Sequence, residues 1–307
     1  MAASPAPRAS VLKATGLVAA GSFGVQISAA VSAGLFAAMG PFEVSSLRML
    51  VAALLLLALF RPRLSGRSRR EWTGIVVYGI AMASMNVALY LAIERIPLGI
   101  AVTLEFLGPT AVALASSRRV PEYLCALMAL GGVVLISLAP GGWFDPLGFL
   151  FALLAGVFFA AYAVLASRVG KSSAGFGGLA LSVTVSSLCT LPWGIGQAFT
   201  TTPEQWGLVA VSAVLGIALP FTVDTVAGGL TSARVVGTLF ALDPVIGSVV
   251  GLIVLGQSLD WAAFAGILLV AAAGALLVWS AERPDSGRLD GERLDGEPGA
   301  APPPPPA

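Results

Sequence analysis

The amino-acid sequence predicts an all-α integral membrane protein of ten transmembrane helices, built as a 5+5 inverted repeat with both chain ends in the cytoplasm. Composition is the first reason. Of 307 residues, 57% are hydrophobic and 11% are charged, and the mean hydropathy is +0.91. Soluble domains carry about 25% charged residues, so this chain belongs in lipid. The other two reasons are the length of the apolar stretches and the distribution of basic residues between the loops.

Ten stretches are long and apolar enough for a helix that crosses the bilayer, which takes about 20 residues. In chain order they cover residues 14–37, 44–60, 72–93, 98–115, 123–138, 147–167, 176–199, 206–228, 233–255 and 261–279. Indole rings prefer the membrane interface, and all six tryptophans lie at predicted helix ends. They are Trp72, Trp143, Trp193, Trp206, Trp261 and Trp279. The first stretch is too long for the apolar core of a signal peptide, so we expect a helix there and no cleavage.

Basic residues gather on one side of the predicted membrane, and Lys and Arg in short loops stay in the cytoplasm. The cytoplasmic side carries Arg8, Lys13, Arg61, Arg63, Arg67, Arg69, Arg70, Arg118, Arg119, Arg168, Lys171, Arg234 and Arg283. The opposite loops carry Glu43, Glu94, Asp145, Glu204 and Asp260, with Arg95 as their only basic residue. Both chain ends are therefore predicted to be cytoplasmic.

Two segments with a carboxylate at or near a proline indicate an internal duplication. Residues 104–109 (LEFLGP) align with residues 239–244 (LFALDP) at one constant offset (239 − 104 = 135). Five helices per repeat is an odd number, so the second repeat enters the membrane from the opposite face. Transporters use such inverted repeats to open a central site alternately to each side.

The duplication divides the chain into four parts. We expect a cytoplasmic N-terminal segment (1–13), a first repeat (14–140), a second repeat (141–280) and a disordered cytoplasmic tail (281–307). The seam between the repeats is Gly141-Gly142. The tail contains the tandem sequence RLDGERLDGE and a run of five prolines, which is too polar to form a core. A regulatory role and inert disorder both remain open for this tail.

The absence of histidine excludes several functions. Haem ligation through histidine, an HExxH zinc site and a Ser-His dyad all require that residue. An aspartyl intramembrane protease would need a second acid in a Gly-x-Gly-Asp context, whereas Asp243 follows Ala241-Leu242. We therefore expect no enzyme, no metal, no cofactor and no nucleic-acid partner. The expected partners are the bilayer and a small-molecule substrate.

Glu105 is the first candidate site residue. It lies about seven residues into its predicted helix, which places it on the order of 10 Å below the outer surface. Gly108 and Pro109 share its face and are expected to break the helix. A carboxyl at this depth suits a group that binds a proton in one state and a substrate ammonium in another. The alternative is a structural acid paired with an arginine.

Asp243 is the second candidate and the deepest acid. It is expected near the middle of the predicted helix 233–255. Pro244 removes a backbone hydrogen bond and so predicts a kink with a polar pocket. Asp243 would carry the proton or the ammonium together with Glu105. The alternative is that Asp243 satisfies the backbone that its proline disrupts.

Further charged residues are candidates at the two ends of the predicted membrane. Arg48 is expected at the level of Glu105, where it would pair with that acid or share a zwitterionic substrate with it. Its alternative is to extend to the lipid headgroups. Asp224 and Arg234 are expected to form either an inner-gate ion pair or a plain interfacial salt bridge.

Neutral polar residues complete the candidate site. Asn86 and Tyr90 are four positions apart and therefore share a helix face, with Met82 one turn earlier. Gln26 and Tyr162 lie at intramembrane depth in the first and sixth predicted helices. Together these groups suit a small polar substrate, although helix-to-helix hydrogen bonds use the same residue types.

Residues 97–119 (PLGIAVTLEFLGPTAVALASSRR) resemble the EamA family of the drug/metabolite transporter superfamily, in particular its amino-acid exporters. The resemblance extends from the first to the tenth predicted helix through the positions Arg48, Tyr78, Gly79, Met85, Asn86, Tyr90, Tyr162, Pro220, Gly237, Thr238 and Leu239. Asp224 and Asp243 stand where those exporters carry glutamate, and Gln257 stands where EamA repeats usually have glutamate after Gly256. The tail has no counterpart.

This resemblance implies secondary active export of small amino acids of the threonine and homoserine type by alternating access and proton antiport. It also implies the cytoplasmic membrane of a bacterium. Oligomeric state stays open, with a monomer compatible. The alternative within the family is an exporter of drugs, amines or other small metabolites.

Overall fold

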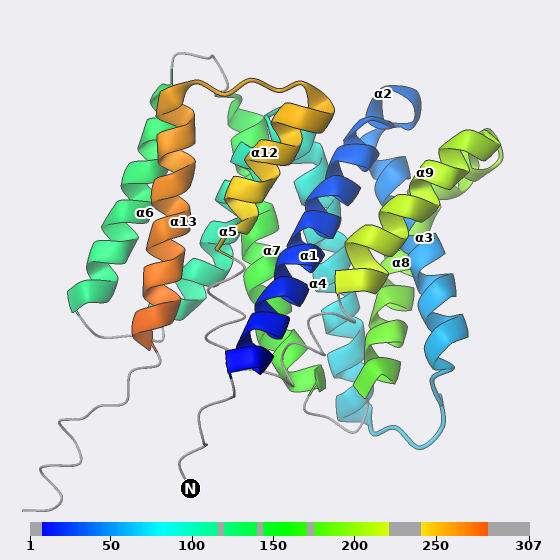
Figure 1. Cartoon of the computed structure of the whole chain (residues 1–307). Helices are drawn as coiled ribbons and strands as arrows, with labels where there is room; N and C mark the ends of the chain where they lie inside the picture. Colours follow the sequence, from blue (N-terminus) through cyan, green and yellow to red (C-terminus); the bar gives the residue numbers. More distant parts are fainter. Residues whose placement is uncertain (1–7, 116–119, 140–143, 171–174, 221–240, 282–307) are drawn as a thin grey trace, which may run out of the picture.

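The computed structural model describes residues 8–115, 120–139, 144–170, 175–220 and 241–281 (Figure 1). These residues form helices and turns, with no strand among them. Four helices are long and apolar enough to cross a membrane, within Pro41–Phe60, Arg69–Ile93, Pro146–Leu165 and Phe176–Ala198. Five more apolar helices are shorter, at Ala19–Ala33, Leu98–Val112, Tyr123–Leu138, Asp243–Leu255 and Trp261–Leu277. The prediction of an all-helical membrane protein is confirmed.

The helices follow the predicted order. They are α1 (Arg8–Ala33), α2 (Phe36–Met39), α3 (Pro41–Phe60), α4 (Arg69–Ile93), α5 (Leu98–Ala115), α6 (Val120–Leu138), α7 (Pro146–Gly170), α8 (Gly175–Ala198), α9 (Pro203–Ala213), a π-helical turn η1 (Val214–Ala218), α12 (Asp243–Leu255) and α13 (Trp261–Ala281). The first predicted helix is shifted, because α1 begins at Arg8 and a turn at Gly34-Leu35 ends it before the expected residue 37. Its start therefore lies inside the segment that was expected to precede the membrane.

Two helices begin with the same capping signal. The Ser68 hydroxyl accepts a hydrogen bond from the Glu71 amide (3.2 Å), and the Glu71 carboxylate accepts one from the Ser68 amide (2.8 Å). Thr202 and Gln205 repeat this capping box at the start of α9, at 3.3 and 2.9 Å. The two boxes stand at nearly the offset seen in the duplicated segments (202 − 68 = 134). α4 and α9, which lie close to the duplication offset from each other, therefore start in the same way.

The helices pack in pairs that join distant parts of the sequence. α3 packs against α8, α4 against α7, and α6 against α13, the last pair forming one side of the molecule in Figure 1. α5 packs against α7 and α12, while α1 packs against α12, α9 and η1. The helices that carry the two candidate acids, α5 and α12, are thus direct neighbours.

Glycines allow the closest helix crossings. A Cβ on Gly132 of α6 would lie 2.6 Å from the Gly266 carbonyl oxygen of α13. A Cβ on Gly108 of α5 would collide with the Gly156 carbonyl oxygen of α7. Without a hydrophobic force between helices in lipid, such small residues let backbones approach and gain dispersion contacts.

The expected helix break at Gly108 and Pro109 is wrong, because α5 runs without interruption through Pro109 to Ala115. Proline removes the amide that would bond to the Glu105 carbonyl, four residues earlier. That carbonyl instead faces Gly156, where an added Cβ would lie 2.9 Å from the Glu105 oxygen. Packing against α7 and α12 on two sides keeps the helix continuous despite the lost bond.

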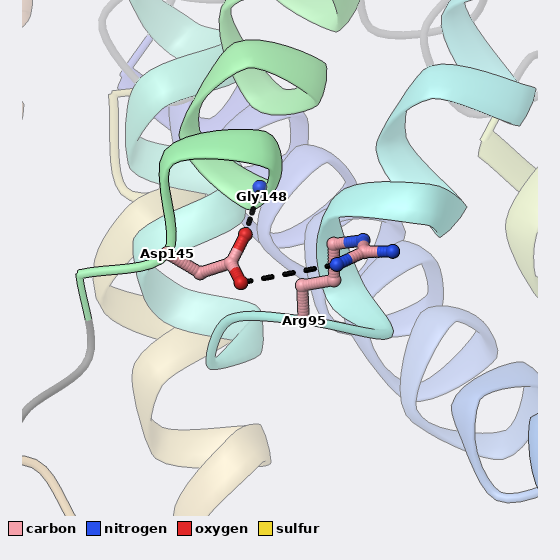
Figure 2. Close-up of polar contacts among 3 residues, drawn as sticks. All are labelled: Arg95, Asp145 and Gly148. Carbon is pink, nitrogen blue, oxygen red and sulfur yellow. Dashed lines mark hydrogen bonds and ion pairs between the residues drawn. The ribbon is translucent and has the colours of Figure 1, made fainter.

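Asp145 links the end of α4 to the start of α7 (Figure 2). Its Oδ1 accepts a hydrogen bond from the Gly148 amide (2.6 Å) and so caps α7, while its Oδ2 lies 3.8 Å from Arg95 Nη1. Both side chains of this ion pair are more than one-third exposed. The cap is therefore expected to matter more than the ion pair.

We expect Asp145→Ala to lower the free energy of unfolding by about 1–2 kcal/mol, the usual cost of a lost N-cap. Asp145→Asn keeps an acceptor oxygen and loses only the exposed ion pair, for at most about 1 kcal/mol. Thermal unfolding of both variants in detergent measures the difference. Equal losses in the two variants would assign the stability to the ion pair instead.

Candidate functional site

Glu105 and Asp243 form the acidic part of the candidate site. Glu105 on α5 is only 8% exposed, and within the described residues its carboxyl makes no hydrogen bond or ion pair. Asp243 is the first residue of α12, which packs against α5. The alternative prediction, that Glu105 is a structural acid paired with an arginine, is therefore not supported by the described residues.

Asp243 does not lie in the middle of a helix as expected. It is the first residue of α12 and follows a turn at Ala241-Leu242, with Pro244 in the first helical turn. Proline is well tolerated there, because the amide it lacks would have no partner inside the helix. Pro244 therefore begins a helix, and the expected mid-helix kink is wrong for this residue.

Gln26 of α1 meets both helices that carry the acids. Its side chain is 2% exposed, and its Oε1 has no hydrogen-bond partner among the described residues. A Cβ on Gly247 would lie 3.2 Å from that oxygen and 3.6 Å from Val102. Gly247 is one turn after Asp243 on α12, and Val102 is about one turn before Glu105 on α5. Three helices thus meet at Gln26, about one turn from each acid, and we call this place the acidic junction.

Arg48 of α3 forms the basic part of the site. The residue is 5% exposed, its Nη2 donates to the Gly216 carbonyl of η1 (3.4 Å), and its guanidinium carbon lies 5.2 Å from the centre of the Tyr90 ring. No carboxylate lies within 4 Å of it in the described part of the chain. The expected pairing with Glu105 is therefore wrong, and so is the alternative of extension to the headgroups. Arg48 is held inside the protein by a carbonyl and an aromatic face.

A chain of hydroxyl groups lies behind Tyr90. The Tyr90 hydroxyl donates to Ser32 Oγ (2.8 Å), which lies 2.6 Å from Ser212 Oγ. Ser28 and Ser212 each donate to the other's backbone carbonyl, at 2.7 and 3.1 Å. These serines join α1 to α9 and are fully buried. Sequence reasoning missed them. The available signal was the i, i+4 spacing of Ser28 and Ser32, which is common in membrane helices.

The remaining candidates occupy separate positions. Asn86 is buried on α4, and its Nδ2 donates to the Met82 carbonyl of its own helix (3.5 Å). Tyr162 of α7 stacks on Tyr78 of α4, with ring centres 5.2 Å apart. The tyrosine contact joins α4 to α7, whereas the Asn86 bond stays within α4. The predicted pair Asp224 and Arg234 lies outside the described residues, as do Gly141-Gly142 and the tail from residue 282.

A buried acid, a half-buried acid on the adjoining helix and a buried arginine, inside an apolar helical protein, indicate a site for a small charged solute. Comparisons with known proteins agree. Residues 146–279 match the EamA-like transporter family. The threonine/homoserine exporters RhtA of Salmonella typhimurium (strain LT2) and Escherichia coli (strain K12) are each 33% identical over 242 residues, covering 76% of this chain and 81% of theirs. A solved crystal structure shares the fold, with a TM-score of 0.58 and 22% identity over 89% of this chain and 99% of its own. The chain therefore belongs to the EamA-like transporter family.

Proposed function

We propose that this protein is a secondary active exporter of small amino acids of the threonine and homoserine type, working by proton antiport in a bacterial cytoplasmic membrane. The observation that carries the proposal is the presence of two unlike charged groups inside one helical core. Glu105 with Asp243 suits an ammonium group, and Arg48 suits a carboxylate. A zwitterion presents both groups. The substrate named for the two exporters at 33% identity supports the same class.

We also propose ten transmembrane helices in two inverted repeats, with both ends in the cytoplasm. The inverted repeat makes α1 equivalent to α7, α3 to α8, α4 to α9, α5 to α12 and α6 to α13. The helix contacts support this arrangement, because replacing each helix by its equivalent gives another observed contact. α4 packs on α7 as α9 packs on α1, and α5 packs on α7 as α12 packs on α1. The pairs α3–α8, α5–α12 and α6–α13 each map onto themselves. The two matching capping boxes provide independent support.

In this mechanism the acids bind either a proton or the substrate ammonium. Two carboxylates in a low-dielectric interior repel each other, so the site is stable only when a cation neutralises part of their charge. Substrate entering from the cytoplasm supplies that cation, and a proton entering from outside replaces it. Gln26, whose Oε1 faces the same junction, supplies a neutral acceptor for the ammonium. Exchange of proton for ammonium between the two open states amounts to antiport.

The test expresses the protein in a bacterial strain that lacks amino-acid exporters and measures survival and efflux under excess threonine and homoserine. We expect tolerance with faster efflux, and loss of both in Asp243→Asn. Glu204→Gln, an exposed acid in the first turn of α9, is the matched control and is expected to behave as the unmodified protein. Protection against amines or drugs without protection against threonine would favour the other exporter class, for which a carboxylate receptor at Arg48 has no use.

A further inference from the structure

Arg48 is a buried cation with most of its hydrogen-bonding capacity unused. A guanidinium has five N–H donors. Within the described residues only Nη2 has a hydrogen bond, at the long distance of 3.4 Å, and Nε has no partner. Burying a charge without a counter-charge costs several kcal/mol. No residue of the described ranges supplies an anion at this position, and a carboxylate fits best, because its two oxygens match the planar fork of arginine.

Three contacts determine where the guanidinium lies, and each depends on the hydroxyl chain. The Tyr90 ring faces the guanidinium, and its orientation is fixed by the bond from its hydroxyl to Ser32. The Gly216 carbonyl is one turn beyond Ser212, whose own position is fixed by the reciprocal bonds with Ser28. The third is the close approach of the guanidinium to Gly216, which requires a glycine. A Cβ there would lie 2.6 Å from Arg48 Nη2 and would collide with Ser28 Oγ.

The carbonyl of Gly216 belongs to a π-helical turn, Val214–Ala218. Such turns widen the helix, change which carbonyls are paired and are frequent at functional sites. Here the Gly216 carbonyl of the turn accepts a hydrogen bond from the guanidinium of α3, and Ser28 of α1 bonds Ser212, two residues before the turn. The local departure from α-helix and the buried arginine thus occur at one place.

We propose that Ser28, Ser32 and Ser212 are positioning residues that hold Tyr90 and the Gly216 carbonyl, so that Arg48 receives the carboxylate of the substrate. This inference rests on the proposed function, which supplies the zwitterionic substrate, and it adds a positioning cluster to that site. The cluster joins both halves of the chain: Ser28, Ser32 and Tyr90 belong to the first, and Ser212 and Gly216 to the second. The carboxylate receptor is therefore complete only while α1 and α9 are in contact.

The test compares Tyr90→Phe and Ser212→Ala with the unmodified full-length protein in proteoliposomes. Tyr90→Phe keeps the ring and removes one donor; Ser212→Ala removes the central hydroxyl. Each is expected to raise the KM for threonine about tenfold, the effect of about one hydrogen bond, with the maximal rate within about twofold. Threonine methyl ester keeps the ammonium and has no carboxylate charge. The preference for threonine over this ester, measured as competition with labelled threonine, should fall by the same factor.

Ser182→Ala is the matched control, because Ser182 is fully buried and its hydroxyl donates only to the Gly178 carbonyl of its own helix. It should change neither the KM nor the preference. A raised KM with unchanged preference would make the cluster purely structural and overturn the inference, as would two variants with unchanged values. In either case threonine transport by the unmodified protein leaves the proposed function standing. Absence of threonine transport by the unmodified protein would overturn both.

Discussion

Glu105→Gln is expected to abolish threonine uptake driven by a pH gradient in proteoliposomes while leaving the protein folded. Glutamine has nearly the same size and shape, so the α5–α12 interface keeps its packing. The glutamine side chain, however, can neither take up a proton nor neutralise the charge of an ammonium group. Without the carboxylate the substrate ammonium loses its buried counter-charge, at a cost of about 3–5 kcal/mol, which corresponds to a loss of about 100-fold or more in transport at low substrate concentration.

The measurement is initial uptake of labelled threonine with and without an imposed pH gradient. Thermal unfolding in detergent checks that the variant is folded. Glu43→Gln is a suitable control, because Glu43 lies in the first turn of α3, outside the acidic junction. If Glu105→Gln kept full uptake that still followed the gradient, the carboxyl would have no part in coupling, and Asp243 alone would remain as the candidate.

The acidic junction lies within a pattern of helix contacts that occurs twice in the molecule. α1 packs on both α12 and α9, as α7 packs on both α5 and α4. α1 and α7, which the proposed repeats make equivalent, therefore each bridge two helices that are distant in sequence. Gln26 lies on one bridge, and the carbonyls of Leu104 and Glu105 face the other at Gly156. If the halves rock against each other as proposed, both bridges would change.

Hydropathy and charge predict the helices well, and α5 begins and ends at the predicted residues 98 and 115. They fail where an apolar run contains a turn. The stretch 233–255 is predicted as one helix, yet the chain turns at Ala241-Leu242 and α12 begins only at Asp243. Hydropathy averages over that turn, and the one local signal was Pro244, which favours the first turn of a helix as strongly as it predicts a kink.

The burial of Glu105 and Arg48 could be predicted from the sequence, and the side chains and carbonyls that they contact could not. Burial in an apolar stretch is enough to mark Glu105 and Arg48 as unusual. Depth along the membrane normal does not say which helices are neighbours, so the expected pair of these two residues was wrong. The hydroxyl chain was missed for a related reason. A serine in a membrane helix can bond its own backbone, as Ser182 does, or a neighbouring helix, as Ser212 does.

Gly108→Ala is expected to prevent correct assembly of the helices. The added methyl group would meet the Gly156 carbonyl oxygen and would lie 2.5 Å from its carbonyl carbon and 2.9 Å from its Cα. All three atoms are backbone, so no side-chain rotation relieves the contact, and α5 and α7 must separate. Overpacking costs about 1–3 kcal/mol even where neighbours can shift. We expect a loss at the upper end of that range, seen as little folded protein after purification.

Gly131→Ala is the matched control, because the nearest atom to its added methyl group is Leu269 Cδ2 at 3.6 Å, an ordinary contact with a flexible side chain. Size-exclusion profiles and thermal unfolding in detergent compare the two variants. A Gly108→Ala protein as stable as Gly131→Ala would show that α5 and α7 are not packed at Gly108 and Gly156. The geometry next to Glu105 would then be wrong as well, since the same crossing places the Glu105 carbonyl against Gly156.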